Sequence, residues 1–200
     1  MPMSDFFERP PAADQTLIGR MIRAARLDPR LYAEVEADAT ATGQAASIVL
    51  LAAFAGGINF PSAPFLILFG GLLAALVGWL LFAYVIYLIG VKLLPEPETK
   101  ADFGALLRAM GFANAPGVVK LLGIVPELRV LVFFVAMVWV LVATVTAVRH
   151  ALSYTSSWRA IGVCAIPLLA SQLLIFAVAS SITESPETHE GMREPPVILP

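Results

Sequence analysis

The distribution of charge along the chain constrains its fold most. Between Ala39 and Val91, 53 consecutive residues include no Lys, Arg, Asp or Glu. Because about 20 apolar residues cross a bilayer once, this stretch is long enough for two crossings. The run from Gly56 to Pro64 holds two glycines and two prolines, which interrupt helices and favour a turn. The sequence therefore predicts a hairpin of two membrane-spanning helices.

The composition of the 200 residues agrees with a lipid environment. The chain is 58% hydrophobic and 14% charged, and its mean hydropathy is +0.82. Soluble domains carry about 25% charged residues. The net charge of -2 does not favour binding to nucleic acid. The single cysteine, Cys164, excludes an intramolecular disulfide.

The two ends of the chain have polar compositions. We expect residues 1–13 and the acidic tail 183–200 to be disordered, since both are rich in proline and acidic residues. The N-terminus lacks a basic region leading into an apolar core, so we expect no cleavable signal peptide. The first apolar segment is then an uncleaved signal anchor.

Residues 14–39 predict a cytoplasmic region of two amphipathic helices. Asp14 or Thr16 is suited to cap the first helix, and Asp28-Pro29 to begin the second. In the first helix the apolar residues occupy one arc and Arg20, Arg23 and Arg26 the opposite side. This pattern is typical of a helix lying among lipid headgroups. Docking on a partner's apolar groove, or on the chain's own bundle, is the alternative.

Five segments are apolar enough to be considered as spans, and the third is ambiguous. The second is about 45 Å long as a helix and exceeds a hydrocarbon core of about 30 Å, so it should tilt or project. The third is short, contains Pro116 and Lys120, and is either a crossing or a re-entrant dip. We predict an all-α membrane bundle of five helices, with four helices plus a re-entrant segment as the alternative. The predicted spans are about 40–57, 65–94, 112–125, 130–148 and 158–182.

The positions of the basic residues predict the orientation. Five arginines precede the first span, and the next basic residue is Lys92. The positive-inside rule therefore places the N-terminus in the cytoplasm. The same rule does not distinguish four crossings from five.

Gly70, Ala74 and Gly78 recur at every fourth position of the second span. Small residues allow helices to approach closely in lipid, where little hydrophobic force drives them together. We expect this stripe to pack against another helix, either within the bundle or across a homodimer.

Asn114, Lys120 and Gln172 are polar residues in predicted spans. Each needs a partner away from water, and ionisable residues at membrane depth are candidates for function. They either satisfy helix carbonyls or line a polar pathway. For Lys120, reaching toward an interface is an equally good explanation.

The sequence contains no catalytic signature. It has no phosphate-binding loop, no His-Glu-x-x-His motif and no nucleophile elbow. The clear spans hold no Asp or Glu, which disfavours ion-coupled transport. We expect a protein that is not an enzyme and that uses no metal or cofactor.

The order of these features resembles the Yip family, named for Ypt-interacting proteins. The resemblance covers roughly residues 40–182 and rests on the hairpin with its long second arm, Gly70 to Trp79, and on Gly111-Phe112-Ala113-Asn114-Ala115-Pro116. In the family this last element opens the third of five spans. Eukaryotic members contact Rab GTPases through an acidic, aromatic motif that has no clear counterpart here. Similarity to bacterial members implies an inner-membrane protein.

The features together predict a membrane protein that acts by binding. We expect it to organise or accompany other membrane proteins, with the lipid bilayer as a further partner and a homo-oligomer left open. A small transporter or channel for a neutral or lipidic solute is the alternative.

Overall fold

The computed structural model describes residues 15–60, 64–95 and 102–169. The chain divides into two units, Met1–Pro167 and Leu168–Pro200. Almost all described residues belong to the first unit, and they form helices and no strands. The helices are α1 (Leu17–Ala25), α2 (Pro29–Ala37), η3 (Ala39–Ala41), α3 (Thr42–Gly57), α4 (Phe65–Leu88), η4 (Ile89–Leu93), α5 (Phe103–Phe112), η5 (Ala115–Ile124), η6 (Pro126–Leu128) and α6 (Arg129–Ala151). A further helix runs over Ser157–Leu169. The all-α prediction is confirmed.

Local sequence signals begin the two N-terminal helices. The Thr16 hydroxyl accepts a hydrogen bond from the Gly19 amide at 3.1 Å and caps α1. The Asp28 carboxylate accepts from the Arg30 amide at 3.0 Å, and Pro29 follows as the first residue of α2. Both caps satisfy amides that have no partner in the first turn. Two of the predicted helix starts are therefore confirmed.

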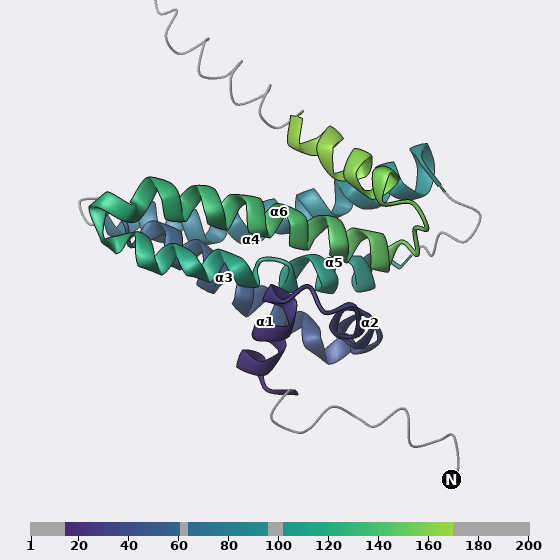
Figure 1. The fold of residues 1–200 in the computed structure, drawn as a ribbon, viewed down its shortest axis with the longest axis horizontal. Coiled ribbons are helices and arrows are strands. Elements are labelled where there is room, and N and C mark those ends of the chain that lie inside the picture. The colour runs from purple at the N-terminus through teal and green to yellow at the C-terminus, as the bar shows by residue number, and fades with distance from the viewer. Residues whose placement is uncertain (1–14, 61–63, 96–101, 170–200) are drawn as a thin grey trace, which may run out of the picture. The chain divides into compact units, whose positions relative to one another are not determined.

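The predicted hairpin consists of α3 and α4. Three helical stretches are long and apolar enough to cross a membrane, namely Ala39–Gly57, Phe65–Leu93 and Pro126–Ala151. Figure 1 shows α3, α4, α5 and α6 side by side, with α1 and α2 against one side of this group. The second stretch changes from α-helix to a π-helical turn, η4, at Ile89.

The segment predicted as the third span has a form that the sequence did not indicate. Before it, α5 runs over Phe103–Phe112, and eight of its ten residues are buried, Ala105 to Phe112. The ambiguous part that follows is a ten-residue 3-10 helix, η5. Both segments pack against α3 and α6.

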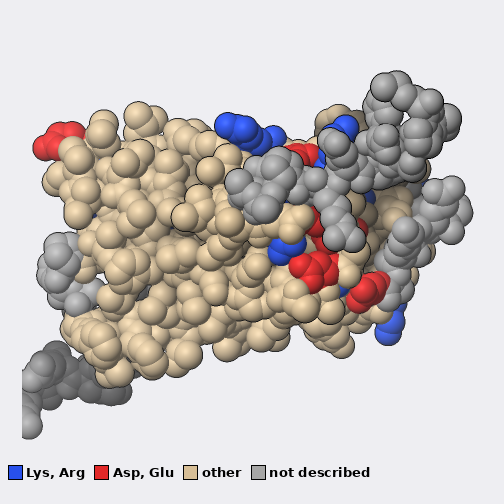
Figure 2. Space-filling view, turned by 90° about the horizontal axis from the view of Figure 1, so that it is seen from below, with Lys and Arg blue, Asp and Glu red and all other residues tan. Residues whose placement is uncertain are grey.

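The core lies around α2, α5 and the C-terminal end of α6. Tyr32, Leu106, Phe112 and Leu152 are among its largest side chains and are fully buried. By contrast, α4 and α6 expose large apolar side chains along their outer faces. In Figure 2 most of the charged side chains gather on the right of the view. The broad tan area to their left carries almost no charged side chains, apart from an acidic one at its left edge. This surface suits lipid.

The last predicted span, 158–182, lies only partly within the described residues. Ser157–Leu169 is helical. The remainder of this span, together with residues 1–13 and the tail 183–200, lies outside the part of the chain that the structure describes.

Candidate functional site

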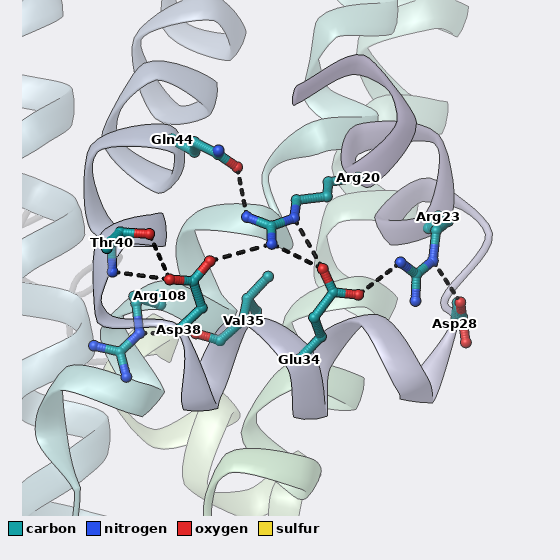
Figure 3. A network of polar contacts seen from close by, with 9 residues as sticks. All are labelled: Arg20, Arg23, Asp28, Glu34, Val35, Asp38, Thr40, Gln44 and Arg108. Atoms are coloured by element: carbon teal, nitrogen blue, oxygen red, sulfur yellow. Dashed lines mark hydrogen bonds and ion pairs between the residues drawn. The ribbon is translucent and has the colours of Figure 1, made fainter. Parts of the chain in front are cut away.

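A cluster of ionic and polar side chains joins α1, α2, α3 and α5. We call it the polar cluster. Figure 3 shows its members, which are Arg20, Arg23, Asp28, Glu34, Asp38, Thr40, Gln44 and Arg108, together with Val35, which contributes its backbone carbonyl. Arg20 and Arg23 come from α1, Glu34 from α2, Gln44 from α3 and Arg108 from α5.

Arg20 is at the centre of the polar cluster and is only 8% exposed. Its guanidinium donates to the Glu34 carboxylate at 2.8 Å, the Asp38 carboxylate at 3.1 Å and the Gln44 amide oxygen at 2.9 Å. Three acceptors from two helices and the turn between them match the fork of donors that an arginine presents. Arg20 thereby links α1 to the beginning of α3.

Arg23 lies one turn further along α1. It donates to the Asp28 carboxylate at 2.9 Å and to the second oxygen of Glu34 at 2.8 Å. Glu34 is therefore shared by two arginines. Since the partly buried Arg20 and Arg23 each have carboxylate partners, the cost of removing these charges from water is offset.

Arg108 attaches α5 to the C-terminal end of α2. Its Nε donates to the Val35 carbonyl at 2.8 Å, and its Nη2 donates to the Glu36 carbonyl. The last carbonyls of an α-helix lack partners within the helix and carry its partial negative charge. Arg108, at 7% exposed, satisfies two of them. Sequence reasoning missed this residue, because its partners are backbone atoms more than seventy positions away.

The predicted membrane-surface residues divide into two kinds of environment. Arg20 and Arg23 face the polar cluster, whereas Arg26 is exposed. On the apolar side of α1, Ile18 and Ile22 are 69% and 47% exposed. The arginine side of α1 thus turns toward the protein, and part of its apolar side faces outward. The sequence signal for this pairing was the acidic pair of Glu34, on α2, and Asp38, which follows the end of α2.

The predicted packing stripe on α4 faces away from the rest of the described protein. Gly70, Ala74 and Gly78 are exposed, and a methyl group placed on either glycine would meet no atom within 4 Å. Close packing inside the bundle occurs elsewhere. A methyl group on Gly111 would lie 2.5 Å from the Ala45 Cβ, and one on Gly117 would lie 3.0 Å from the Ala52 Cβ.

The three residues predicted for a polar pathway are not brought together in the described residues. The Asn114 amide, in the turn between α5 and η5, donates to the Met110 carbonyl in the last turn of α5 at 2.9 Å. The Lys120 side chain crosses Gly56, with its Cδ 3.6 Å from where a Cβ would lie. Gln172 lies outside the described residues. The 3-10 repeat of three residues places 114, 117, 120 and 123 on one face.

The described residues hold no group of three or more His, Cys, Asp or Glu side chains that could bind a metal ion. The chemistry of the polar cluster is ion pairing and helix capping. The Thr40 hydroxyl, which donates to Asp38, and the Arg20 guanidinium lower the pKa of the Asp38 carboxyl.

The family model described as the Yip1 domain matches residues 34–179. Comparison with curated proteins and with solved structures gives no significant match.

Proposed function

We propose, from the membership of this chain in the Yip1 domain family, that it is an integral membrane protein that binds and organises other membrane proteins. Family membership and the three apolar helices show that it belongs in a membrane. The binding role is the proposal. The family is not known for enzymes, which agrees with a role in binding.

The observation that carries this proposal is the outer face of α4. Only Trp79, Ala83 and Ile86 of its 24 residues are buried. The exposed face includes the stripe of Gly70, Ala74 and Gly78, where a neighbouring helix could approach its backbone closely. Such approach is a main source of association in lipid. We assign this stripe to contact with a helix of another membrane protein.

The proposal is tested by enlarging the stripe. In the double variant Gly70→Ile, Gly78→Ile, the added Cβ atoms meet no atom within 4 Å and both sites are exposed, so the bundle itself should fold. Crosslinking in native membranes, followed by purification in mild detergent, should then recover far less of the associated chains. The control is Leu66→Ile, Leu81→Ile, which alters exposed side chains of α4 without changing their volume. Equal recovery from both variants would refute the stripe as the contact surface.

We also propose that α5 and η5 together form the third of five crossings. Ten α-helical and ten 3-10 residues span about 15 Å and about 20 Å, enough for a core of about 30 Å. Their contacts follow α3 in register: Gly111 meets Ala45, and Gly117 meets Ala52. At the end of α3, Gly123 meets Asn59. Residues 111–123 therefore lie beside the spanning helix α3 along its length. This arrangement favours a full crossing over a re-entrant dip.

The N-terminal helices are proposed to lie at the cytoplasmic surface of a bacterial inner membrane. Exposed Ile18 and Ile22 suit the boundary between headgroups and acyl chains. Arg26 is exposed and is placed to meet anionic headgroups, while Arg20 and Arg23 support the helix from within.

The surface position of α1 is tested by depth-dependent quenching. A fluorophore on Ile22→Cys, in a Cys164→Ser background, should be quenched best by lipids labelled near the headgroup. The exposed Arg30→Cys serves as the comparison. Quenching of the Ile22 label only by a water-soluble quencher would place α1 in solution.

A further inference from the structure

An apolar groove lies between α3 and α4 at the hairpin end of the bundle. It has a volume of about 620 Å³, within the range of about 300–1,000 Å³ that ligand pockets occupy. Its walls include Ala53, Gly57 and Phe60 from one side and Leu68, Gly71 and Leu72 from the other. A methyl group on Gly71 would meet no atom within 4 Å, whereas Leu68 packs directly against Gly57. The lining offers apolar contact and suits a hydrocarbon chain.

One cation stands at the Phe60 wall of this groove. The Arg129 guanidinium carbon lies 5.9 Å from the centre of the Phe60 ring, within the range of a cation–π contact. Its Nε donates to the Gly123 carbonyl at 3.3 Å. These contacts leave further N–H donors of the guanidinium available.

A second cation, Lys120, lies against the last turn of α3. The Lys120 side chain runs across Gly56, the residue before Gly57 in α3. The backbone of Lys120 is fixed there by Asn59, whose amide donates to the Lys120 carbonyl at 3.0 Å and to the Ala55 carbonyl at 2.8 Å. Asn59 is 1% exposed, so this attachment is shielded from water.

Neither cation has an acidic partner in the described part of the chain. Lys120 and Arg129 form no ion pair there, in contrast to Arg20 and Arg23. The nearest acidic residue in sequence, Glu127, is exposed and is not paired with either of them. A cation in surroundings of low polarity favours a nearby anion strongly. The two positive charges at the hairpin end therefore favour binding of an anionic ligand.

We propose that this groove binds an anionic phospholipid. An acyl chain fills the space between α3 and α4, and the phosphate lies at the rim between Lys120 and Arg129. Basic positions between transmembrane helices bind anionic lipid headgroups on the same principle. The apolar groove explains why the ligand is a lipid, and the two unpaired cations explain why it is an anionic one.

The test measures lipid binding to the full-length chain in detergent micelles by native mass spectrometry. Dioleoylphosphatidylglycerol should bind on the order of tenfold more tightly than dioleoylphosphatidylcholine, because only the first carries net charge for the two cations. The double variant Lys120→Gln, Arg129→Gln should abolish this preference. The exposed Lys92→Gln serves as the matched loss of a cation at the other end of α4.

The groove itself is tested by a neighbouring pair of glycines. Gly71→Leu places a side chain in the groove, whereas Gly70→Leu adds the same side chain next to it, and both sites are free of atoms within 4 Å. Gly71→Leu should weaken binding of both lipids, and Gly70→Leu should not. The comparison of these two glycine variants remains informative even if the charge variants fail to fold.

Three results would overturn the proposal. Equal affinity for the two lipids would remove the role of the cations. Equal effects of Gly71→Leu and Gly70→Leu would remove the role of the groove. Competition by inorganic phosphate or glycerophosphate as strong as that by phosphatidylglycerol would indicate a water-soluble anion in place of a lipid.

Discussion

Arg20 and Arg108 are both buried, and their acceptors differ in kind. Arg20 pairs with carboxylates and an amide oxygen, which are side-chain groups. Arg108 pairs with backbone carbonyls at the end of α2. Loss of either guanidinium would leave buried acceptors without donors, and this penalty exceeds the net value of the hydrogen bonds themselves.

We predict that Arg108→Met lowers the free energy of unfolding by about 2 kcal/mol, since hydrogen bonds involving a charged group contribute about 1.5–3 kcal/mol. The methionine keeps much of the buried volume but cannot donate to the Val35 and Glu36 carbonyls. Denaturation in mixed micelles measures the difference. The control is Arg30→Met at an exposed position, and an equal loss of stability in both variants would contradict the capping role.

The pKa of Asp38 predicts how the stability of the N-terminal helices changes with pH. The Thr40 hydroxyl and the Arg20 guanidinium lower the pKa of this carboxyl in the folded state. The stabilisation is therefore complete above the unfolded-state pKa of about 3.9 and is lost as the pH falls through the lowered folded-state pKa. Between pH 6 and pH 3, wild type should lose more stability than Asp38→Asn. A parallel decline of the two proteins would rule out this contribution.

At the scale of elements, α5 owes its position to residues that lack bulk. A methyl group on Gly111 would lie 2.5 Å from the Ala45 Cβ and 3.0 Å from Cζ2 of Trp79. The Trp79 indole donates to the Leu107 carbonyl at 3.2 Å. Three helices therefore meet at Gly111, and none of them can move away without loss of packing.

The pair Gly111→Ala and Gly78→Ala tests this packing. We expect Gly111→Ala to destabilise the protein by about 1–3 kcal/mol, as overpacking does. Gly78→Ala, at a site open to the surroundings, should be neutral or stabilise by up to about 1 kcal/mol through helix propensity. Unfolding in mixed micelles distinguishes the two. Similar values would mean that α5 can shift to accommodate the added methyl group.

The end of α4 depends on a contact from a distant loop. The Tyr154 hydroxyl lies 2.8 Å from the Gly90 carbonyl and 2.9 Å from the Leu94 carbonyl, at the two ends of the π-helical turn η4. Carbonyls at a helix end need such donors. Tyr154 thus holds the unusual turn in place.

We predict that Tyr154→Phe lowers the free energy of unfolding by about 1 kcal/mol, the net value of one hydrogen bond. Tyr84→Phe is the matched control, because Tyr84 is 50% exposed and its ring contact with Phe103 survives the change. Amide hydrogen exchange at Gly90 to Leu94 should also increase in Tyr154→Phe alone. Unchanged exchange there would show that η4 holds without the tyrosine.

At the scale of the whole molecule, the number of crossings determines on which side the chain ends. Five crossings place the two termini on opposite sides of the membrane, and four place them on the same side. Reporters fused before Met1 and after Pro200 should therefore report the cytoplasm and the exterior respectively. Two cytoplasmic reporters would support the re-entrant alternative for residues 112–125.

Several elements could be predicted because their signals are local. The charge-free stretch and the glycine and proline pair in the turn indicated the hairpin, and Thr16 and Asp28 indicated helix starts. The same local signals did not distinguish an α-helix from the 3-10 form of η5, because both suit a short apolar segment with Pro116 near its start. The π-helical turn was not predicted either, and its carbonyls contact Tyr154, a residue about sixty positions away.

The candidate site was predicted less well than the fold. A helical wheel placed Arg20, Arg23 and Arg26 on one side of α1, but it carries no information about what that side faces. In the structure Glu34 and Asp38 attract two of the arginines inward. The spacing of Gly70, Ala74 and Gly78 likewise left packing within the bundle and packing between chains equally open, and the exposed position of the stripe favours the second.

The sequence by itself determined the solvent of this protein, its helical class and the family to which it belongs. Hydrophobicity, charge and helix-breaking residues act over a few turns, so these properties can be read from neighbouring positions. Which faces are buried, which arginines are paired, and which cations at the hairpin end lack an acidic partner among the described residues became known only from the folded structure. Each of these depends on contacts between residues far apart in the chain, whose geometry no local pattern specifies.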